Sequence, residues 1–190
     1  MAKAKAKPTA SRNSSPSKKA KPTRKTAAKK PIAQPLVSTG FWLMKSEPES
    51  YSIDALAQDG KTLWTGVRNY QARNFMMHSM NPGDKFLFYH SNAEPPGVFG
   101  IGKVVRPNCP DPSATDPKDE HRDPKATREM PIWFCAEVEF VSKFNNPVTL
   151  PQIRAEKSLA KMALLAPGQR LSVQPVRAED FQKILELAKL

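Results

Sequence analysis

The sequence has little cysteine and no long apolar run. Only Cys109 and Cys135 occur among its 190 residues, so the fold does not depend on a disulfide framework, and we interpret both as ordinary intracellular thiols. No apolar stretch approaches the roughly 18 residues that a transmembrane helix needs. We therefore expect an intracellular monomer with no membrane partner.

Acidic residues are absent from the first 46 positions, and Glu47 is the first to occur. Eleven lysines and arginines lie within residues 1–40, so most of the formal net charge of +12 belongs to this segment. The segment has no aromatic residue and few branched apolar ones, and such a chain cannot bury enough surface to offset its ordering entropy. Residues 1–39 are therefore predicted to form a disordered basic arm.

The arm is predicted to bind the phosphate backbone of a nucleic acid, as basic arms of this kind commonly do. A solubilising tail and a targeting peptide are the alternatives. The arm lacks the apolar region of a secretory signal, and its five prolines oppose the amphipathic helix of a transit peptide. The residues that we expect to contact phosphates are Lys18, Lys19, Lys21, Arg24, Lys25, Lys29 and Lys30.

The remaining 150 residues are nearly neutral and lack familiar catalytic patterns. The three histidines are far apart in sequence, and no cysteine accompanies them at the spacing of a metal site. The glycines between positions 97 and 102 match no nucleotide-binding loop and indicate a strand with a bulge or a close backbone approach. The acidic residues between 111 and 123 alternate with basic ones, which is typical of a solvated loop. We therefore expect no cofactor, no metal and no enzymatic activity.

The body, residues 40–190, contains segments of both strand and helix character. Their irregular order favours an α+β fold with a mixed, mostly antiparallel sheet or small barrel over a doubly wound fold. A long loop is expected over 107–131. Strands are expected over 41–44, 62–64, 84–90, 97–105, 132–141 and 171–176, and helices over 52–60, 70–80 and 151–165 and from 178 onward.

The stretch from Val67 to Asn74, VRNYQARN, crowds polar side chains into the start of a predicted helix. A helix start already carries unpaired N–H groups and partial positive charge, so arginines at 68 and 73 favour a nearby anion or polar ligand. Trp64 lies just upstream and offers a flat face for stacking, while Ser46 and Glu47 offer acceptors for the edge of a base. The alternative is that Trp64 belongs to the core and that Arg68 pairs with a carboxylate inside the fold.

Four ordered motifs in the body resemble the EVE domain. They are WLMKSEP at 42–48, WTGVRNYQARN at 64–74, LFYHSN at 87–92 and RLSVQPV at 170–176. The resemblance implies a PUA-like fold, in which a curved mixed sheet forms a pseudo-barrel with helices around it. It also implies binding of a modified nucleobase, with modified cytosine in DNA as the favoured candidate.

The resemblance implies a set of nucleobase-binding residues in this sequence. Lys45 to Glu47 would form one pocket wall, Trp64 the stacking face, and the helix start from Asn69 to Arg73 the entrance. The turn from Tyr89 to Asn92 and the segment from 172 to 174 would lie at or beneath the rim. Trp133 is a candidate for a second aromatic wall, and the alternation of its strand also permits a core position. The full set is Lys45, Ser46, Glu47, Trp64, Val67, Arg68, Asn69, Tyr70, Arg73, Asn74, His90, Ser91, Asn92, Trp133, Ser172 and Gln174.

Two other functions remain open on the sequence. PUA-like folds often serve RNA, so an RNA-binding module is the first alternative. A nuclease or base-processing enzyme that uses Glu47 or the acidic loop is the second. The expected location is the nucleus in a eukaryote, and the cytoplasm, in contact with the nucleoid, in a bacterium.

The arm makes the first prediction. Deleting residues 1–39 should flatten the salt dependence of binding to duplex DNA. The logarithm of the binding constant falls linearly with the logarithm of the salt concentration, and each phosphate that the protein neutralises adds about 0.9 to the slope. Titrations of the full and shortened chains at several salt concentrations measure this slope. An unchanged slope would show that the arm does not bind phosphates.

Overall fold

The computed structural model describes residues 39–189. The basic arm lies outside these residues, so its disorder and its phosphate contacts stay predictions. Within the described part of the chain, no helix is both long enough and apolar enough to cross a membrane.

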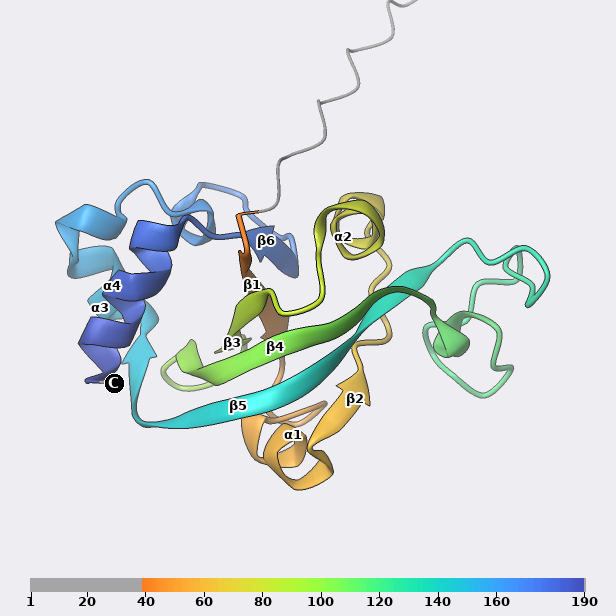
Figure 1. The fold of residues 1–190 in the computed structure, drawn as a ribbon, viewed down its shortest axis with the longest axis horizontal. Coiled ribbons are helices and arrows are strands. Elements are labelled where there is room, and N and C mark those ends of the chain that lie inside the picture. The colour runs from red at the N-terminus through yellow and green to blue at the C-terminus, as the bar shows by residue number, and fades with distance from the viewer. Residues whose placement is uncertain (1–38, 190) are drawn as a thin grey trace, which may run out of the picture. The chain divides into compact units, whose positions relative to one another are not determined.

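A single mixed sheet organises the body (Figure 1). The strand order is β2-β5-β4-β3-β1-β6; β1 and β3 are parallel, and every other neighbouring pair is antiparallel. This is the predicted α+β class with a mixed, mostly antiparallel sheet. The sheet is open, with β2 and β6 at its edges. The strands are β1 Phe41–Ser46, β2 Lys61–Leu63, β3 Lys85–His90, β4 Gly97–Pro110, β5 Phe134–Thr149 and β6 Val173–Pro175.

The central strands are buried on both faces. In β1, Trp42 and Met44 belong to one apolar cluster, whereas Leu43 between them belongs to another. In β3, Phe86 packs in the first cluster and Leu87 in the second. Strands covered on both sides have continuous apolar sequences, which explains the run at 41–44.

The helices cover both faces of the sheet. Helix α1 and the segment from α2 to Met80 pack in the first cluster, and α3 and α4 pack in the second. Side chains cap two of these helices at their N-termini: Ser52 Oγ accepts from Ala55 N at 3.0 Å, and Asn69 Oδ1 accepts from Gln71 N at 2.9 Å. The helices are α1 Ile53–Asp59, α2 Tyr70–Asn74 with a π-helical turn Phe75–Ser79, α3 Leu150–Ala155 and α4 Ala178–Ala188.

The helix predicted over 151–165 is wrong in length. Helix α3 ends at Ala155 because Glu156 adopts an extended backbone and uses its side chain to cap the next turn, accepting from Ser158 N at 3.1 Å. Two short 3-10 turns follow, at Lys157–Leu159 and Ala163–Leu165.

The segment predicted as one long loop over 107–131 has more structure than expected. Strand β4 continues to Pro110, and a 3-10 turn follows at Pro112–Ala114. Ala114, Ala126 and Trp133 then form a small apolar core of their own. We call residues 111–133 the lobe. In Figure 1 the lobe lies at one end of the long β4–β5 ribbon, and α3 and α4 lie at the other.

Three glycines allow β4 to pass close to its neighbours, as predicted. A Cβ atom at Gly97 or Gly100 would lie 2.5 Å from a backbone oxygen of β5. A Cβ atom at Gly102 would overlap the ring of Phe86 and lie 2.9 Å from Glu139 O. The register of β4 against β5 also shifts repeatedly, and such bulges bend and twist a sheet.

The close approach at Gly102 gives the second prediction. Gly102→Ala should lower the free energy of unfolding by about 1–3 kcal/mol, because the added methyl group overpacks the core. Denaturant unfolding measures the loss.

The matched test is the same substitution together with Phe86→Leu, which makes room for the methyl group. The double variant should be more stable than the sum of the two single losses implies. Simple additivity would show that the Phe86 ring is not what excludes a side chain at 102.

Candidate nucleic-acid interface

One wall of the candidate site is the corner where β1 ends. Ser91 N donates to Ser46 O at 3.0 Å, and Asn92 Nδ2 donates to Glu47 Oε1 at 2.8 Å. Lys45 N donates to Ser172 O at 2.8 Å. These bonds join three segments that are far apart in sequence, so the motifs at 42–48, 87–92 and 170–176 meet in one wall.

The opposite wall is the extended segment Thr62–Arg68. Gly66 has φ +79°, and a Cβ atom there would lie 3.3 Å from the imidazole ring of His121 in the lobe. Gly66 N donates to Asp111 Oδ2 at 3.1 Å. Glycine at 66 therefore permits both the turn and the close approach of the lobe.

The buried carboxylate of Asp111 fixes Arg68. Arg68 Nη1 donates to Asp111 Oδ2 at 2.7 Å, and Arg68 Nη2 donates to Ser113 Oγ at 2.8 Å. Arg68 Nε donates to His121 O at 2.6 Å. The guanidinium is thus bound on three sides by protein, which is the alternative that the sequence left open for Arg68. Arg68 therefore positions the lobe, and its donors are used within the protein instead of binding an anion.

A cavity of about 1520 Å³ lies between these two walls and the lobe. Nine of the predicted site residues line it: Lys45, Ser46, Glu47, Trp64, Val67, Arg68, Ser91, Asn92 and Ser172. The lining mixes both signs of charge. Burial lowers the pKa of Lys45, whose ammonium group also lies 5.8 Å from the centre of the Tyr89 ring. The cavity is also lined by residues that were not predicted from the sequence: Ser50, Tyr51, Thr62, Leu63, Thr65, Gly66, Lys118, Asp119, Glu120, His121 and Arg170.

Trp64 forms an apolar floor instead of a free stacking face. Only 7% of its surface is exposed, and its ring makes edge contacts with Phe86 and Phe88, at centroid distances of 5.9 and 5.3 Å. Tyr51 meets it edge-on at 6.5 Å and adds a second aromatic surface to the cavity. Burial, followed by the hydrogen bond to Asp59, raises the pKa of Tyr51 to about 12, so its hydroxyl stays protonated.

Two predicted site residues belong to the interior and do not line the cavity. His90 is 3% exposed, and its Nε2 accepts from Ile53 N at 3.3 Å. Burial lowers the pKa of His90, which keeps the ring neutral and able to accept this bond. Gln174 is 1% exposed and donates to Leu171 O at 2.7 Å. These residues were expected at or beneath the rim, and their side chains point into the fold. Their role in base binding stays a prediction.

Five further predicted residues gather beside the cavity without lining it. Asn69 caps α2, and Asn74 accepts from Arg73 Nη2 at 2.7 Å. Tyr70 stacks on Trp133 at a centroid distance of 4.8 Å. Trp133 is buried and donates from Nε1 to Asp123 Oδ2 at 2.7 Å, so it supports the lobe and is not a cavity wall.

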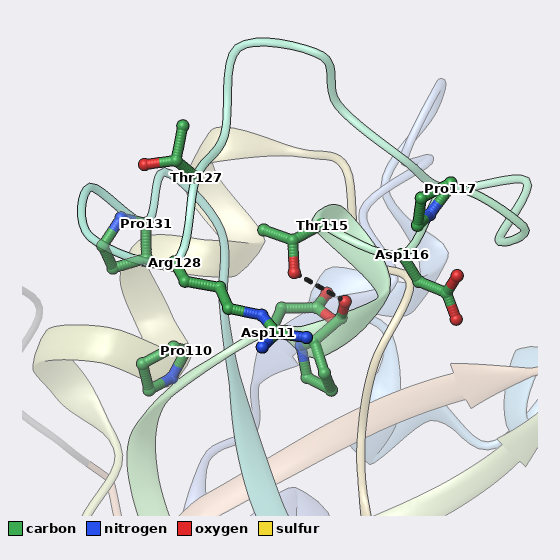
Figure 2. Close-up of a pocket in the computed structure, with 9 residues that line it drawn as sticks. Pro110, Asp111, Thr115, Asp116, Pro117, Thr127, Arg128 and Pro131 are labelled. Atoms are coloured by element: carbon green, nitrogen blue, oxygen red, sulfur yellow. Dashed lines mark hydrogen bonds between the residues drawn. The ribbon is translucent and has the colours of Figure 1, made fainter.

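A second hollow, of about 520 Å³, lies on the lobe (Figure 2). Pro110, Pro117 and Pro131 surround it, and the Arg128 side chain extends across it toward Asp111. Its lining has no aromatic ring on which a base could stack. The larger cavity is therefore the stronger candidate for a nucleobase.

Some of the cavity residues that were not predicted have a recognisable signal in the sequence, and others have none. Arg170 belongs to a motif that carried the resemblance, and Tyr51 is an aromatic residue four positions after Glu47. Lys118 to His121 gave no signal, because contact between the lobe and Gly66 depends on how the β4–β5 ribbon bends.

This chain belongs to the EVE domain family, whose model matches residues 40–187. It is 40% identical over 164 residues to thymocyte nuclear protein 1 of Gallus gallus, covering 77% of this chain and 67% of that one. A solved structure from Pseudomonas syringae matches with a TM-score of 0.75 and 47% identity, covering 78% of this chain and 99% of that one. The human THYN1 protein, solved in complex with 5-methylcytosine-containing DNA, matches with a TM-score of 0.72 and 37% identity, covering 79% and 98%.

Asp111 gives the third prediction. Asp111→Ala should lower the free energy of unfolding by about 3–5 kcal/mol, because it leaves the Arg68 cation without its buried partner. Denaturant unfolding measures the loss, with Glu129→Ala, an exposed acid of the same lobe, as the control. A loss of less than about 1 kcal/mol, the range of surface ion pairs, would show that the pair does not hold the lobe.

Proposed function

We propose that this chain is a non-catalytic DNA-binding protein whose cavity holds one modified cytosine, most simply 5-methylcytosine, turned out of the duplex. The observation that carries the proposal is the cavity, in which a hydrogen-bonding corner at 45–47 faces an aromatic floor at Trp64. The human relative solved with 5-methylcytosine-containing DNA supports the choice of ligand.

Glu47 is the residue that we propose for recognising cytosine. A carboxylate accepts a hydrogen bond from the exocyclic N4 amine of cytosine, and thymine has no such donor. Asn92 binds Oε1 of Glu47, which orients the carboxylate and leaves the other oxygen for a base. Ser46 and Lys45 beside it offer a hydroxyl and a cation to the remaining polar edge.

The size of the cavity fits a nucleotide with part of its backbone. Ligand pockets usually enclose about 300–1,000 Å³, so about 1520 Å³ leaves room for a base, its sugar and a flanking phosphate. Lys118, His121 and Arg170 line the same cavity and lie in loops, where side chains can approach a phosphate.

The energetics limit how selective such a cavity is for a methyl group. Turning a base out of a duplex costs a few kcal/mol, which stacking and hydrogen bonds in the cavity must recover. Burying one methyl group contributes about 0.8 kcal/mol, a factor of about four in affinity. We therefore expect modest preference for 5-methylcytosine over cytosine unless polar groups also discriminate.

The basic arm completes the proposed mechanism. It would gather the protein onto DNA through phosphates, independently of sequence, while the body examines single bases. By this proposal the chain acts wherever the chromosome lies, which is the nucleus in a eukaryote and the nucleoid in a bacterium.

The fourth prediction tests recognition directly. We would titrate the full chain, at one moderate salt concentration, with matched oligonucleotides that contain cytosine, 5-methylcytosine or 5-hydroxymethylcytosine, as DNA and as RNA. Binding should be tightest to one modified DNA. Glu47→Gln should weaken that binding about tenfold, because one direct base contact is worth about 1–3 kcal/mol.

Glu49→Gln is the control, since it removes an exposed acid two residues away that does not line the cavity. Equal affinity for every base form would refute a modified-base reader, and tighter binding to RNA would favour the RNA-binding alternative. Loss of substrate on incubation, abolished by Glu47→Gln, would show an enzyme.

A further inference from the structure

Next to the cavity, an exposed tyrosine ring rests on a buried tryptophan. Tyr70 is 59% exposed, although it is a large aromatic residue, and it stacks on Trp133 with 24° between the ring planes. Among the described residues, the other large apolar side chains that are exposed are Met130, at 72%, and Val141, at 43%. Such exposure of a ring whose partner is buried leaves the ring's other face open to solvent.

The outer face of Tyr70 is not covered by Arg73. The Arg73 guanidinium carbon lies 4.8 Å from the centre of the Tyr70 ring and 5.9 Å from that of Trp133, while the two rings are 4.8 Å apart. A guanidinium on the far side of Tyr70 would lie much farther from Trp133, at nearly the sum of the two shorter distances. Arg73 therefore lies beside the pair of rings, where Ile132 O holds it by accepting from Nη1 at 2.9 Å.

We propose that the outer face of Tyr70 is a second base-binding site, which stacks the nucleobase next to the one held in the cavity. For its partner this inference rests on the proposed DNA-binding function. A flat aromatic face accepts any base, and a neighbouring arginine adds cation–π attraction and charge for the backbone.

Continuity with the cavity indicates an adjacent nucleotide as the occupant. The Arg68 guanidinium carbon lies 5.3 Å from the centre of the Trp133 ring, and Arg68 also lines the cavity. Only one residue, Asn69, separates Arg68 from Tyr70 along the chain. A strand whose modified base enters the cavity would thus carry its neighbour past Tyr70.

The site is also held rigidly before any ligand arrives. Trp133 is fixed by Asp123, and Arg68 is fixed by Asp111 and Ser113. The Asn69 cap sets the start of the helix that carries Tyr70. A platform fixed in this way loses little conformational entropy on binding, which favours affinity.

The fifth prediction uses three variants of the full chain and the modified duplex that it prefers. Tyr70→Ala should weaken binding about 5- to 160-fold, the range that corresponds to loss of stacking on one base. Tyr70→Phe keeps the ring and should bind within twofold of the unchanged protein. Val141→Ala, which trims an exposed apolar residue of β5, is the control and should also bind within twofold.

A change in the DNA tests the same contact with the unchanged protein. Abasic nucleotides are placed in turn on the 5′ and 3′ side of the modified cytosine. At one of these two positions, the abasic nucleotide should lower the affinity of the unchanged protein more than that of Tyr70→Ala, because the variant has no ring on which that base could stack. An abasic neighbour also makes it easier to turn the modified cytosine out of the duplex. This effect is the same for both proteins, so comparing their affinities removes it.

The outcomes separate this inference from the proposed function. Equal effects of both abasic positions on the unchanged protein and on Tyr70→Ala would overturn the second site, even if the modified base is recognised. Dependence on Tyr70 without any preference for the modified base would support the second site and refute the reader. If Tyr70→Phe bound as weakly as Tyr70→Ala, stacking would be refuted, and the result would indicate a role for the Tyr70 hydroxyl.

Discussion

The candidate site depends on one ion pair, between the buried carboxylate of Asp111 and the partly buried guanidinium of Arg68. Asp111 follows the last residue of β4, whereas Arg68 lies in the wall opposite the β1 corner, so the pair fixes the lobe over the cavity. Removing the Asp111 carboxylate from water is costly, and here the cost is offset because Arg68, Ser113 and Gly66 donate to it. His121 O accepts from Arg68 Nε. Without this pair, the lobe would lose the one ion pair that joins it to the Thr62–Arg68 wall among the described residues.

The sheet supplies the other half of the site through its connectivity. Because β1 and β3 run in parallel, their carboxyl ends lie at the same end of the sheet, where Ser46 is paired with His90. The segments that follow, at Glu47 and Asn92, therefore leave the sheet side by side and hydrogen-bond to each other. Polar side chains are found where buried strands end, because the chain leaves the apolar core there and meets water.

Local patterns in the sequence were sufficient for most of the fold. Apolar runs predicted the central strands, and apolar residues at helical spacing predicted the helices that begin at Ile53 and Tyr70. The helix over 151–165 was overestimated because its composition gives no sign that the Glu156 side chain caps a new turn. In the site, the motifs indicated the residues of the walls, but the inward orientation of His90 and Gln174 follows from strand alternation against neighbours that the sequence does not identify. The lobe's approach to Gly66 depends on a curved ribbon, and curvature of this kind has no local signature.

The lobe separates the residues that hold it in place from those that face the cavity. Asp111, Ser113 and Trp133 are buried and hold the lobe together. Lys118 and Glu120, by contrast, are exposed and line the cavity. Substitutions at these two positions change the chemistry offered to a ligand at little cost in folding free energy. If the proposed function holds, single substitutions at these surface positions can change ligand preference without compensating changes in the core.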